Sequence, residues 1–316
     1  MSSRRALVRD AIRRAGGVAA DTVPLGRSPA PVTTPFATSA LVEGDRVRAI
    51  AVGAPTPVPG PVGFLDGVQR HAVEGHVGVA PVVRGYVAAA VLERVDGMLR
   101  VAALAEEAFL ALPLARLGSD ARDAFEATGL PLYETGEERP HPLLDLSAAA
   151  AVVQARRERV ERDVGVDFVA RHADARLVVD GGLQAFAGVP GAERLLGVIK
   201  SHETQFLAGG DQLTALTLPA GSRSSVFRRG RDVPAAMWTW YLRLHPWPAH
   251  AILHGLVRIE RAPGHHVVAE ADAVSRWILA ERAPLAAPDG RWDRLLYPIH
   301  EVETFLRARA GRGVGE

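Results

Sequence analysis

Apolar runs that end at glycine or aspartate dominate the first part of the chain beyond residue 55. Residues 62–70 form a short apolar run, residues 78–97 a longer β-branched one, and the pair Asp96-Gly97 is typical of a tight hairpin into residues 98–106. We expect three consecutive, mainly antiparallel strands in this region.

Helical periodicity replaces this pattern from residue 110 onward. A long helix is predicted over residues 145–173, with Asp145 or Ser147 as its N-cap. Further elements follow in order: a strand at 175–183, an apolar stretch at 193–207, a hairpin from 236–245 and 251–261, a helix around 268–282, and a last helix that starts near 297. Strands that are followed by helices in this order predict an α/β fold, a mixed sheet flanked by helices.

The chain divides into an N-terminal arm, residues 1–55, and a main domain, residues 56–316. The proline-rich stretch 54–62 separates them. The arm opens with an arginine-bearing amphipathic helix, which is compatible with a transit peptide but more typical of a docking helix. We therefore expect the arm to serve in docking or dimerisation.

Composition excludes several classes of protein. The 316 residues contain no cysteine, which rules out disulfide-stapled modules, thiol enzymes and sulfur-ligated metal sites. A net charge of +1 excludes nucleic-acid binding by bulk charge, although a local basic groove stays possible. No apolar stretch is long enough to span a membrane, so we expect a cytoplasmic protein without membrane contact. The nucleotide-binding P-loop, the G-x-S-x-G elbow and the H-E-x-x-H motif are all absent.

Two aspartates are each predicted to lie at the end of a buried strand, directly before a glycine. Asp66 comes after Gly63-Phe64-Leu65, and Asp180 comes after Leu177-Val178-Val179. If the two strands are neighbours, these carboxylates converge, and Mg²⁺ or Mn²⁺ would be their natural counter-charge because both ions prefer oxygen ligands. The alternative is that each Asp-Gly pair only makes a turn.

The long helix offers further carboxylates, and the chain offers one lysine. Glu158 and Glu161 are three residues apart and share a helix face, where they serve either as metal ligands or as part of a solvated salt-bridge face. Lys200 is the single lysine in a chain with 36 arginines. It is suited to hold a scissile phosphate or an attacking water, unless it survives by chance.

The ordered set of these motifs resembles the NurA nuclease family. It comprises FLDGVQ at 64–69, RRERVE at 156–161, LVVDGGL at 177–183, GVIKS at 197–201 and LLYPIHEVE at 295–303. The resemblance implies an RNase H-like core, a homodimer, Mn²⁺-dependent (or Mg²⁺-dependent) DNA cleavage, and assembly on a HerA-type hexameric ATPase in DNA end processing or phage defence.

The family's functional residues match particular positions of this chain. Its two aspartates match Asp66 and Asp180, its helix glutamate falls at Glu158 or Glu161, and its tyrosine before proline matches Tyr297. The family's histidine normally lies further along than His300, so that the last metal ligand is His300, Glu301 or Glu303, or the site is impaired.

Two other segments suggest binding chemistry. The stretch 222–232 contains Arg223, Phe227, Arg228 and Arg229, which are suited to contact phosphates and stack on a base, although a solvated loop is the commoner explanation. His245, His250 and His254 suggest zinc, but no cysteine or acidic ligand pattern accompanies them, and we expect His250 and His254 to point out of one strand face.

The sequence thus predicts a metal-dependent deoxyribonuclease, with Lys200 and Tyr297 positioning the phosphate. The alternative is a catalytically impaired adaptor that docks on a ring ATPase and guides DNA, motivated by the displaced histidine. A nuclease acting on RNA or hybrids differs only in substrate, and no residue reports a contact to a 2′-hydroxyl.

Overall fold

Three long antiparallel strands lie next to one another in the sheet of the computed structural model. The structure describes residues 4–24, 37, 39–136, 141–229, 236–247, 250–264, 266–283 and 292–313. The three strands are β4 (Val62–Val77), β5 (Ala80–Val95) and β6 (Met98–Leu112). The turn from β5 to β6 has Asp96 and Gly97 at positive φ angles of 51° and 77°, which confirms the predicted hairpin.

Further strands extend these three on both sides into one mixed sheet. Beside β4 lies β8 (Arg176–Asp180), which runs parallel to it, and β9 (Leu195–Ile199) runs parallel to β8. From edge to edge the order is β2-β11-β12-β13-β9-β8-β4-β5-β6-β7, with β1 on β4, and with β10 between β12 and β3. The remaining strands are β1 (Val18–Pro24), β2 (Ser39–Leu41), β3 (Ala49–Ala51), β7 (Leu132–Glu134), β10 (Ser222–Ser224), β11 (Phe227–Arg229), β12 (Trp238–Arg243) and β13 (Leu256–Arg261).

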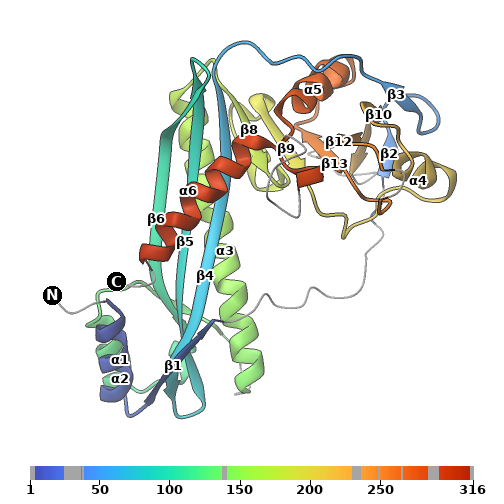
Figure 1. Cartoon of the computed structure of the whole chain (residues 1–316). Coiled ribbons are helices and arrows are strands. Elements are labelled where there is room, and N and C mark those ends of the chain that lie inside the picture. The colour runs from blue at the N-terminus through green and yellow to red at the C-terminus, as the bar shows by residue number, and fades with distance from the viewer. Residues whose placement is uncertain are drawn as a thin grey trace.

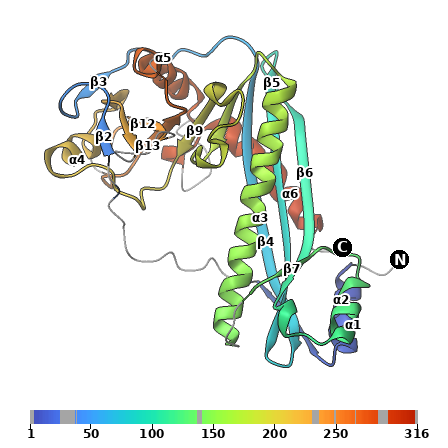
Figure 2. The ribbon, with the colours of Figure 1, turned by 180° about the vertical axis from the view of Figure 1, so that it is seen from behind.

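Helices cover both faces of the long strands, which confirms the predicted α/β fold. The helix α3 (Pro142–Arg171) lies along one face, and α6 (Tyr297–Gly313) crosses the other (Figures 1 and 2). The other α-helices are α1 (Arg4–Arg14), α2 (Ser119–Glu126), α4 (Gly209–Leu216) and α5 (His266–Glu281). Across the described residues, every helix is too short or too polar to cross a membrane.

Alternation along β4 and β5 supplies the two cores on either side of the sheet. Phe64 and Ala90 belong to the apolar cluster that includes residues of α5 and α6, whereas Leu65 and Val91 belong to the cluster that includes residues of α3. Successive strand residues point to opposite faces, so that both faces must be apolar when both are covered. The continuous apolar runs of the sequence follow from this two-sided burial.

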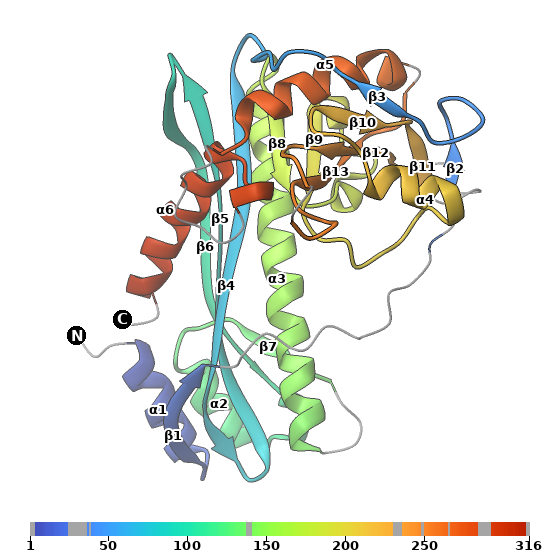
Figure 3. The same ribbon diagram turned by 45° about the vertical axis from the view of Figure 1, so that its right-hand side comes forward.

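The described part of the N-terminal arm is divided between two places on the sheet. At the far end of the long strands, α1 packs against α2, and β1 pairs with β4 (Figure 3). At the other edge of the sheet, β2 pairs with β11 and β3 pairs with β10. The arm therefore contributes strands to the same sheet as the main domain.

Three element boundaries differ from the predicted ones. The N-cap of α3 is His141, whose ring nitrogen accepts a hydrogen bond from the backbone N–H of Leu143, and not Asp145 or Ser147. Asp145 is buried inside the first turn, 2.6 Å from a guanidinium nitrogen of Arg116. The region after residue 110 is only partly helical because β6 continues to Leu112.

The third difference concerns Asp66, which does not end its strand. β4 continues for 11 residues to Val77 because β5 pairs with it along its whole length, including Asp66 with Ala90 and Gly67 with Ala89. The Asp66-Gly67 pair therefore makes no turn. Asp180, in contrast, is the last residue of β8, as predicted.

Candidate active site

Asp66 and Asp180 occupy neighbouring positions on adjacent parallel strands. The paired residues of β4 and β8 run up to Leu65 with Val179, so that the next position on each strand is an aspartate. The two carboxylates interact electrostatically, and Asp66 is only 8% exposed. The predicted convergence of these two residues is confirmed.

Lys200 provides the counter-charge at this point. It directly follows β9, the strand next to β8, and its ammonium nitrogen lies 2.9 Å from each carboxylate oxygen of Asp180. The side chains of Lys200 and Asp180 are 17% and 24% exposed, so that the ion pair is partly shielded from water. The single lysine of the sequence therefore pairs with one of the two predicted aspartates.

Glu161 on α3 joins the two aspartates because the helix approaches β4 very closely. A Cβ atom at Gly67 would lie 2.5 Å from Cγ of Glu161, a distance that only glycine permits. Gly63 on the strand and Gly165 on the helix similarly make room for large side chains of the opposite element. The glycines thus bring the Glu161 side chain against the strand that carries Asp66. We refer to Asp66, Glu161 and Asp180 as the acidic cluster.

Burial and like charges raise the pKa values of two members of this cluster. Burial raises the pKa of Asp66 well above its usual range, and the charge of Asp180 adds to this, while Lys200 opposes it. Burial raises the pKa of Glu161 to about 7, with Arg157 opposing and Asp180 reinforcing the shift. Carboxyl groups with such pKa values bind protons or cations near neutral pH.

A buried glutamate that the sequence analysis missed fixes the loop after Asp180. Glu260 of β13 is fully buried and accepts a hydrogen bond from the backbone N–H of Leu183 at 2.8 Å. Arg258 and Arg229 pair with its other oxygen at 2.6 and 2.8 Å. The alternation of apolar and polar residues in this strand suggested that Glu260 faces solvent. The one sequence signal for a buried ion pair was the presence of Arg258 and Arg261 close to it in the chain.

The structure separates the two candidate glutamates of the long helix. The Glu158 side chain is 51% exposed and accepts a hydrogen bond from Gln154, whereas the Glu161 side chain is 13% exposed and pairs with Arg157. Only Glu161 interacts electrostatically with both aspartates. The salt-bridge interpretation therefore applies to Glu158.

The candidates on α6 have no described contact with the acidic cluster. Tyr297 is 50% exposed at the start of the helix, and Nδ1 of His300 is buried without a hydrogen-bond partner. Glu303 pairs with Arg307. The start of α6 is nevertheless tied to the neighbourhood of Lys200, because Arg294 donates a hydrogen bond to the Lys200 carbonyl at 3.1 Å.

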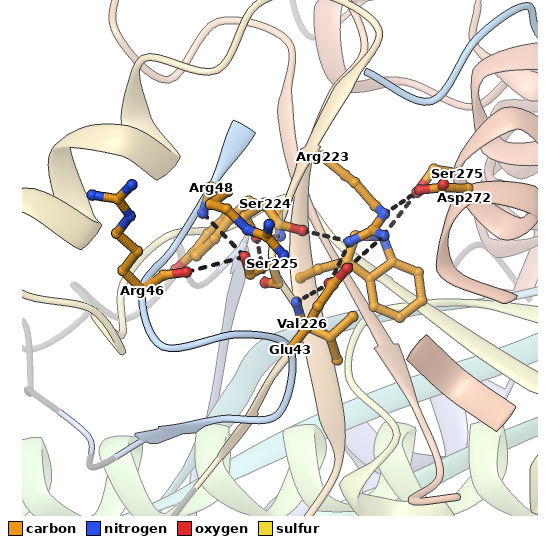
Figure 4. A network of polar contacts seen from close by, with 11 residues as sticks. Glu43, Arg46, Arg48, Arg223, Ser224, Ser225, Val226, Asp272 and Ser275 are labelled. Atoms are coloured by element: carbon orange, nitrogen blue, oxygen red, sulfur yellow. Dashed lines mark hydrogen bonds and ion pairs between the residues drawn. The ribbon is translucent and has the colours of Figure 1, made fainter. Parts of the chain in front are cut away.

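The first part of the predicted DNA-contacting stretch is buried, and Figure 4 shows the polar contacts of Arg223 within it. Arg223 is 3% exposed and pairs with Glu43 and Asp272, and Phe227 is fully buried in an apolar cluster. Arg229 pairs with Glu260, and Arg228 is half-buried. The interpretation of Arg223 and Phe227 as phosphate and base contacts is therefore wrong, since these side chains hold β10 and β11 in the sheet. Residues 230–232 of this stretch lie outside the described residues.

The three histidines lie around the loop between β12 and β13. His250 and His254 stack at 4.1 Å, and His254 lies 3.5 Å from Asp293. His245 is 5% exposed and packs against Trp292. His250 and His254 do not point out of a strand face as expected, because β13 begins only at Leu256.

A divalent cation fits the acidic cluster by the chemistry of its donors. Three carboxylates of like charge, two of them with raised pKa values, favour a hard cation with oxygen ligands. Within the described ranges, however, no group of three or more His, Asp or Glu side chains is arranged so that it could hold a metal ion. In this conformation Lys200 takes both oxygens of Asp180.

The fold and the site define a mixed α/β protein in which Asp180 and Lys200 lie at the carboxyl ends of two parallel strands, beside Asp66 within β4 and Glu161 on α3. No protein-family model matches the sequence, and no curated protein matches it. Among solved structures, the chain is similar to the crystal structure of the NurA nuclease from Sulfolobus solfataricus, with a TM-score of 0.45 and 10% sequence identity over 88% of this chain and 86% of that chain. This similarity concerns the path of the chain alone, and it does not assign a role to any residue.

Proposed function

We propose that this protein is a divalent-metal-dependent nuclease that cleaves phosphodiester bonds in DNA. The observation that carries the proposal is the acidic cluster beside Lys200, in which Asp66 is 8% exposed yet adjacent to a second aspartate. Burying carboxylates together is costly, and such groups are concentrated at functional sites. The motif series that resembles the NurA family supports the same chemistry.

The residues of the chain have separate parts in this proposal. Asp66, Asp180 and Glu161 would be the ligands of a Mn²⁺ or Mg²⁺ ion, although among the described residues they are not arranged as a preformed metal site. When bound, the ion would lower the pKa of water and neutralise charge on a phosphate. Lys200 supplies a compact positive charge for a phosphate oxygen. Tyr297 and His300 are further candidates for positioning from α6.

Substitution of the two aspartates tests the proposal. With Mn²⁺, Asp66→Asn and Asp180→Asn should each lower EDTA-sensitive degradation of single-stranded and blunt duplex DNA by about 100-fold or more. Asp163→Asn is the matched control, since that side chain is 57% exposed on the same helix as Glu161. Thermal melts should show all three variants folded. Full activity of either cluster variant would contradict the proposal.

We infer the partners from the family resemblance. They are a HerA-type hexameric ATPase and a second copy of the chain, in DNA end processing or phage defence. Cleavage should therefore be assayed with and without such an ATPase, and mass photometry should report the assembly. Cleavage that needs the ATPase supports the partnership, and equal activity in its absence counts against it.

A catalytically impaired adaptor is the second candidate. The observation that favours it is the ion pair in which Lys200 holds both oxygens of Asp180 at 2.9 Å, together with the absence of a preformed group of three metal ligands among the described residues. An adaptor would bind the ring ATPase yet show no EDTA-sensitive DNA degradation with Mn²⁺ or Mg²⁺. The same assay therefore separates the two functions.

A further inference from the structure

A cavity of about 540 Å³ lies at the end of the parallel strands that is opposite to the acidic cluster. It is lined by the segment 56–59, the first residues of β8 and β9, the last residue of β13, and α5. Its volume falls in the range of small-molecule sites in proteins, about 300–1,000 Å³. Arg176 and Asp180 are at opposite ends of β8, and four residue steps separate them by about 13 Å. The cavity is thus distinct from the candidate active site.

Arginines dominate the charged lining of this cavity. Arg176, Arg194, Arg261 and Arg276 face only two glutamates, Glu193 and Glu270. The Arg194 guanidinium is held by the backbone carbonyls of Val169 and His172 at the end of α3, to which two of its nitrogens donate. Four guanidinium groups against two carboxylates give the lining an excess of positive charge.

Arg261 has one long contact with a carboxylate and one hydrogen bond to a carbonyl. Its side chain is 12% exposed, and its Nε–H is buried without a hydrogen-bond partner. Its other nitrogens donate to the Glu193 carbonyl at 2.7 Å and to Glu270 at 3.3 Å, the second a long contact to a side chain that is itself 49% exposed. The long contact with a half-exposed Glu270 compensates the Arg261 charge only weakly, so that an anion in the cavity would add a favourable interaction.

Arg176 and Arg276 add positive charge without carboxylate partners among the described contacts. Arg176 donates to the Pro59 carbonyl at 3.2 Å, and Arg276 donates to the Val52 carbonyl at 2.9 Å. Carbonyl oxygens accept these hydrogen bonds but leave the guanidinium charges uncompensated. Guanidinium groups have the planar fork that matches phosphate oxygens.

The rest of the wall is apolar and includes an indole ring. It consists of Pro57, Val58, Leu195, Leu196, Val274 and Trp277. The indole N–H of Trp277 donates to Glu281 at 2.9 Å, so that this polar group is already satisfied. Trp277 itself is only 4% exposed within the core, so that the apolar surface open to a ligand group is mainly that of Pro57 and Val58.

We propose that this cavity binds a nucleoside monophosphate, with the phosphate on Arg261, Arg176 and Arg276 and the base against the apolar wall. The inference rests on the cavity alone and is independent of the proposed nuclease function. A charged end and a flat apolar end in one cavity select for a ligand with both features, and neither a free phosphate nor a nucleoside has both.

Calorimetric titration of the full chain in EDTA tests this assignment with three probes: AMP, adenosine and inorganic phosphate. AMP should bind at one saturable site, at least about tenfold more tightly than either of the others. Arg261→Gln should weaken AMP binding about tenfold or more, since a hydrogen bond to a charged group is lost. Ala273→Phe should have the same effect, because Ala273 is exposed on α5 at the cavity wall and a large side chain there fills the cavity.

Arg282→Gln is the matched control, as Arg282 is exposed and donates to a backbone carbonyl, that of Leu244, but lies outside the cavity. It should bind AMP like the unmodified protein. Circular dichroism checks that each variant is folded. If Arg261→Gln does not fold, AMP binding by Ala273→Phe tests the assignment instead. The assignment is overturned if AMP does not bind, if adenosine or phosphate binds as tightly as AMP, or if Ala273→Phe binds normally.

Discussion

Glu161 illustrates how the environment of one side chain sets its chemistry. It is 13% exposed, pairs with Arg157, and interacts with the charge of Asp180. Burial outweighs the attraction of Arg157, so that the pKa of Glu161 is raised to about 7 from an ordinary value of 4.5. The folded protein therefore binds a proton at Glu161 more tightly than the unfolded chain does.

This pKa shift predicts a particular dependence of stability on pH. Because the folded-state pKa is raised, the contribution of Glu161 to stability is complete below pH 4.5 and is lost as the pH rises to about 7. Glu161→Gln removes the titration, so in metal-free buffer it should leave stability at pH 4 nearly unchanged. At pH 8 it should raise the free energy of unfolding by up to about 3 kcal/mol.

Urea denaturation at the two pH values measures this difference. Glu158→Gln, three residues away and 51% exposed, is the matched control and should show no such pH-dependent gain. An equal gain for both variants, or none for Glu161→Gln, would refute the assigned cause of the pKa shift.

At the residue scale, the sequence predicted the aspartates and the lysine but could not decide between Glu158 and Glu161. Their spacing puts both on one face of an isolated helix, and only the contact with Gly67 distinguishes them. Glu260 was missed for a related reason, because its partners Arg229 and Leu183 lie 31 and 77 residues away in the chain. In both cases, contacts with residues distant in the chain determine which glutamate is buried.

At the element scale, the seam between α3 and β4 positions the acidic cluster. Gly63, Gly67 and Gly165 lie along this seam, and a Cβ atom on any of them would come within 3.0 Å of a side chain of the opposite element. The seam therefore depends on residues that have no side chain at all. Glu161 is held against β4 by the same packing.

Gly67→Ala should force α3 away from β4. The new methyl group would meet Cγ and Oε1 of Glu161 at 2.5 and 2.6 Å, and such overpacking costs about 1–3 kcal/mol. Gly210→Ala is the control, since nothing lies within 4 Å of its added Cβ in α4, and it should leave stability unchanged or slightly raised. Thermal melts measure both. A melting temperature of Gly67→Ala equal to that of the unmodified protein would contradict the close seam.

The order and type of most elements were predictable because apolar runs and helical periodicity are local signals. The segment with Arg223 and Phe227 was not, because a basic and aromatic run fits both an exposed loop and short paired strands. The partners that bury Arg223 are Glu43 in the N-terminal arm and Asp272 in α5. The end of β4 was misjudged at Asp66-Gly67, since local preference favours a turn there and the pairing with β5 overrides it.

On the scale of the whole molecule, the far end of the long strands has a core of its own. Val8 and Ile12 of α1 and Phe125 of α2 are fully buried in a cluster that is separate from the two cores beside α3 and α6. β4, β5 and β6 run through both ends and connect them. The acidic cluster is near the other end, at the junction with β8 (Figure 1).

Because the two ends have separate cores, a destabilising substitution at the far end should unfold that end without unfolding the acidic cluster. Ile12→Asp places a charge in that core and should abolish hydrogen-exchange protection in α1 and α2, while β8 and the middle of α3 keep theirs. Leu7→Asp is the control on the same helix, because Leu7 is 38% exposed and should tolerate the charge. Loss of protection at residues 176–180 in Ile12→Asp would show that the two ends unfold together.

Since Lys200 is the only lysine in 316 residues, the protein has a natural reporter for amine-specific reagents. Apart from the terminal amine, acylation has one target, and this target is ion-paired to Asp180 with 17% of its side chain exposed. A cation that displaced the ammonium from Asp180 would free the amine for reaction. The rate of acylation, read by mass spectrometry, would then titrate occupancy of the site without any added label or substitution.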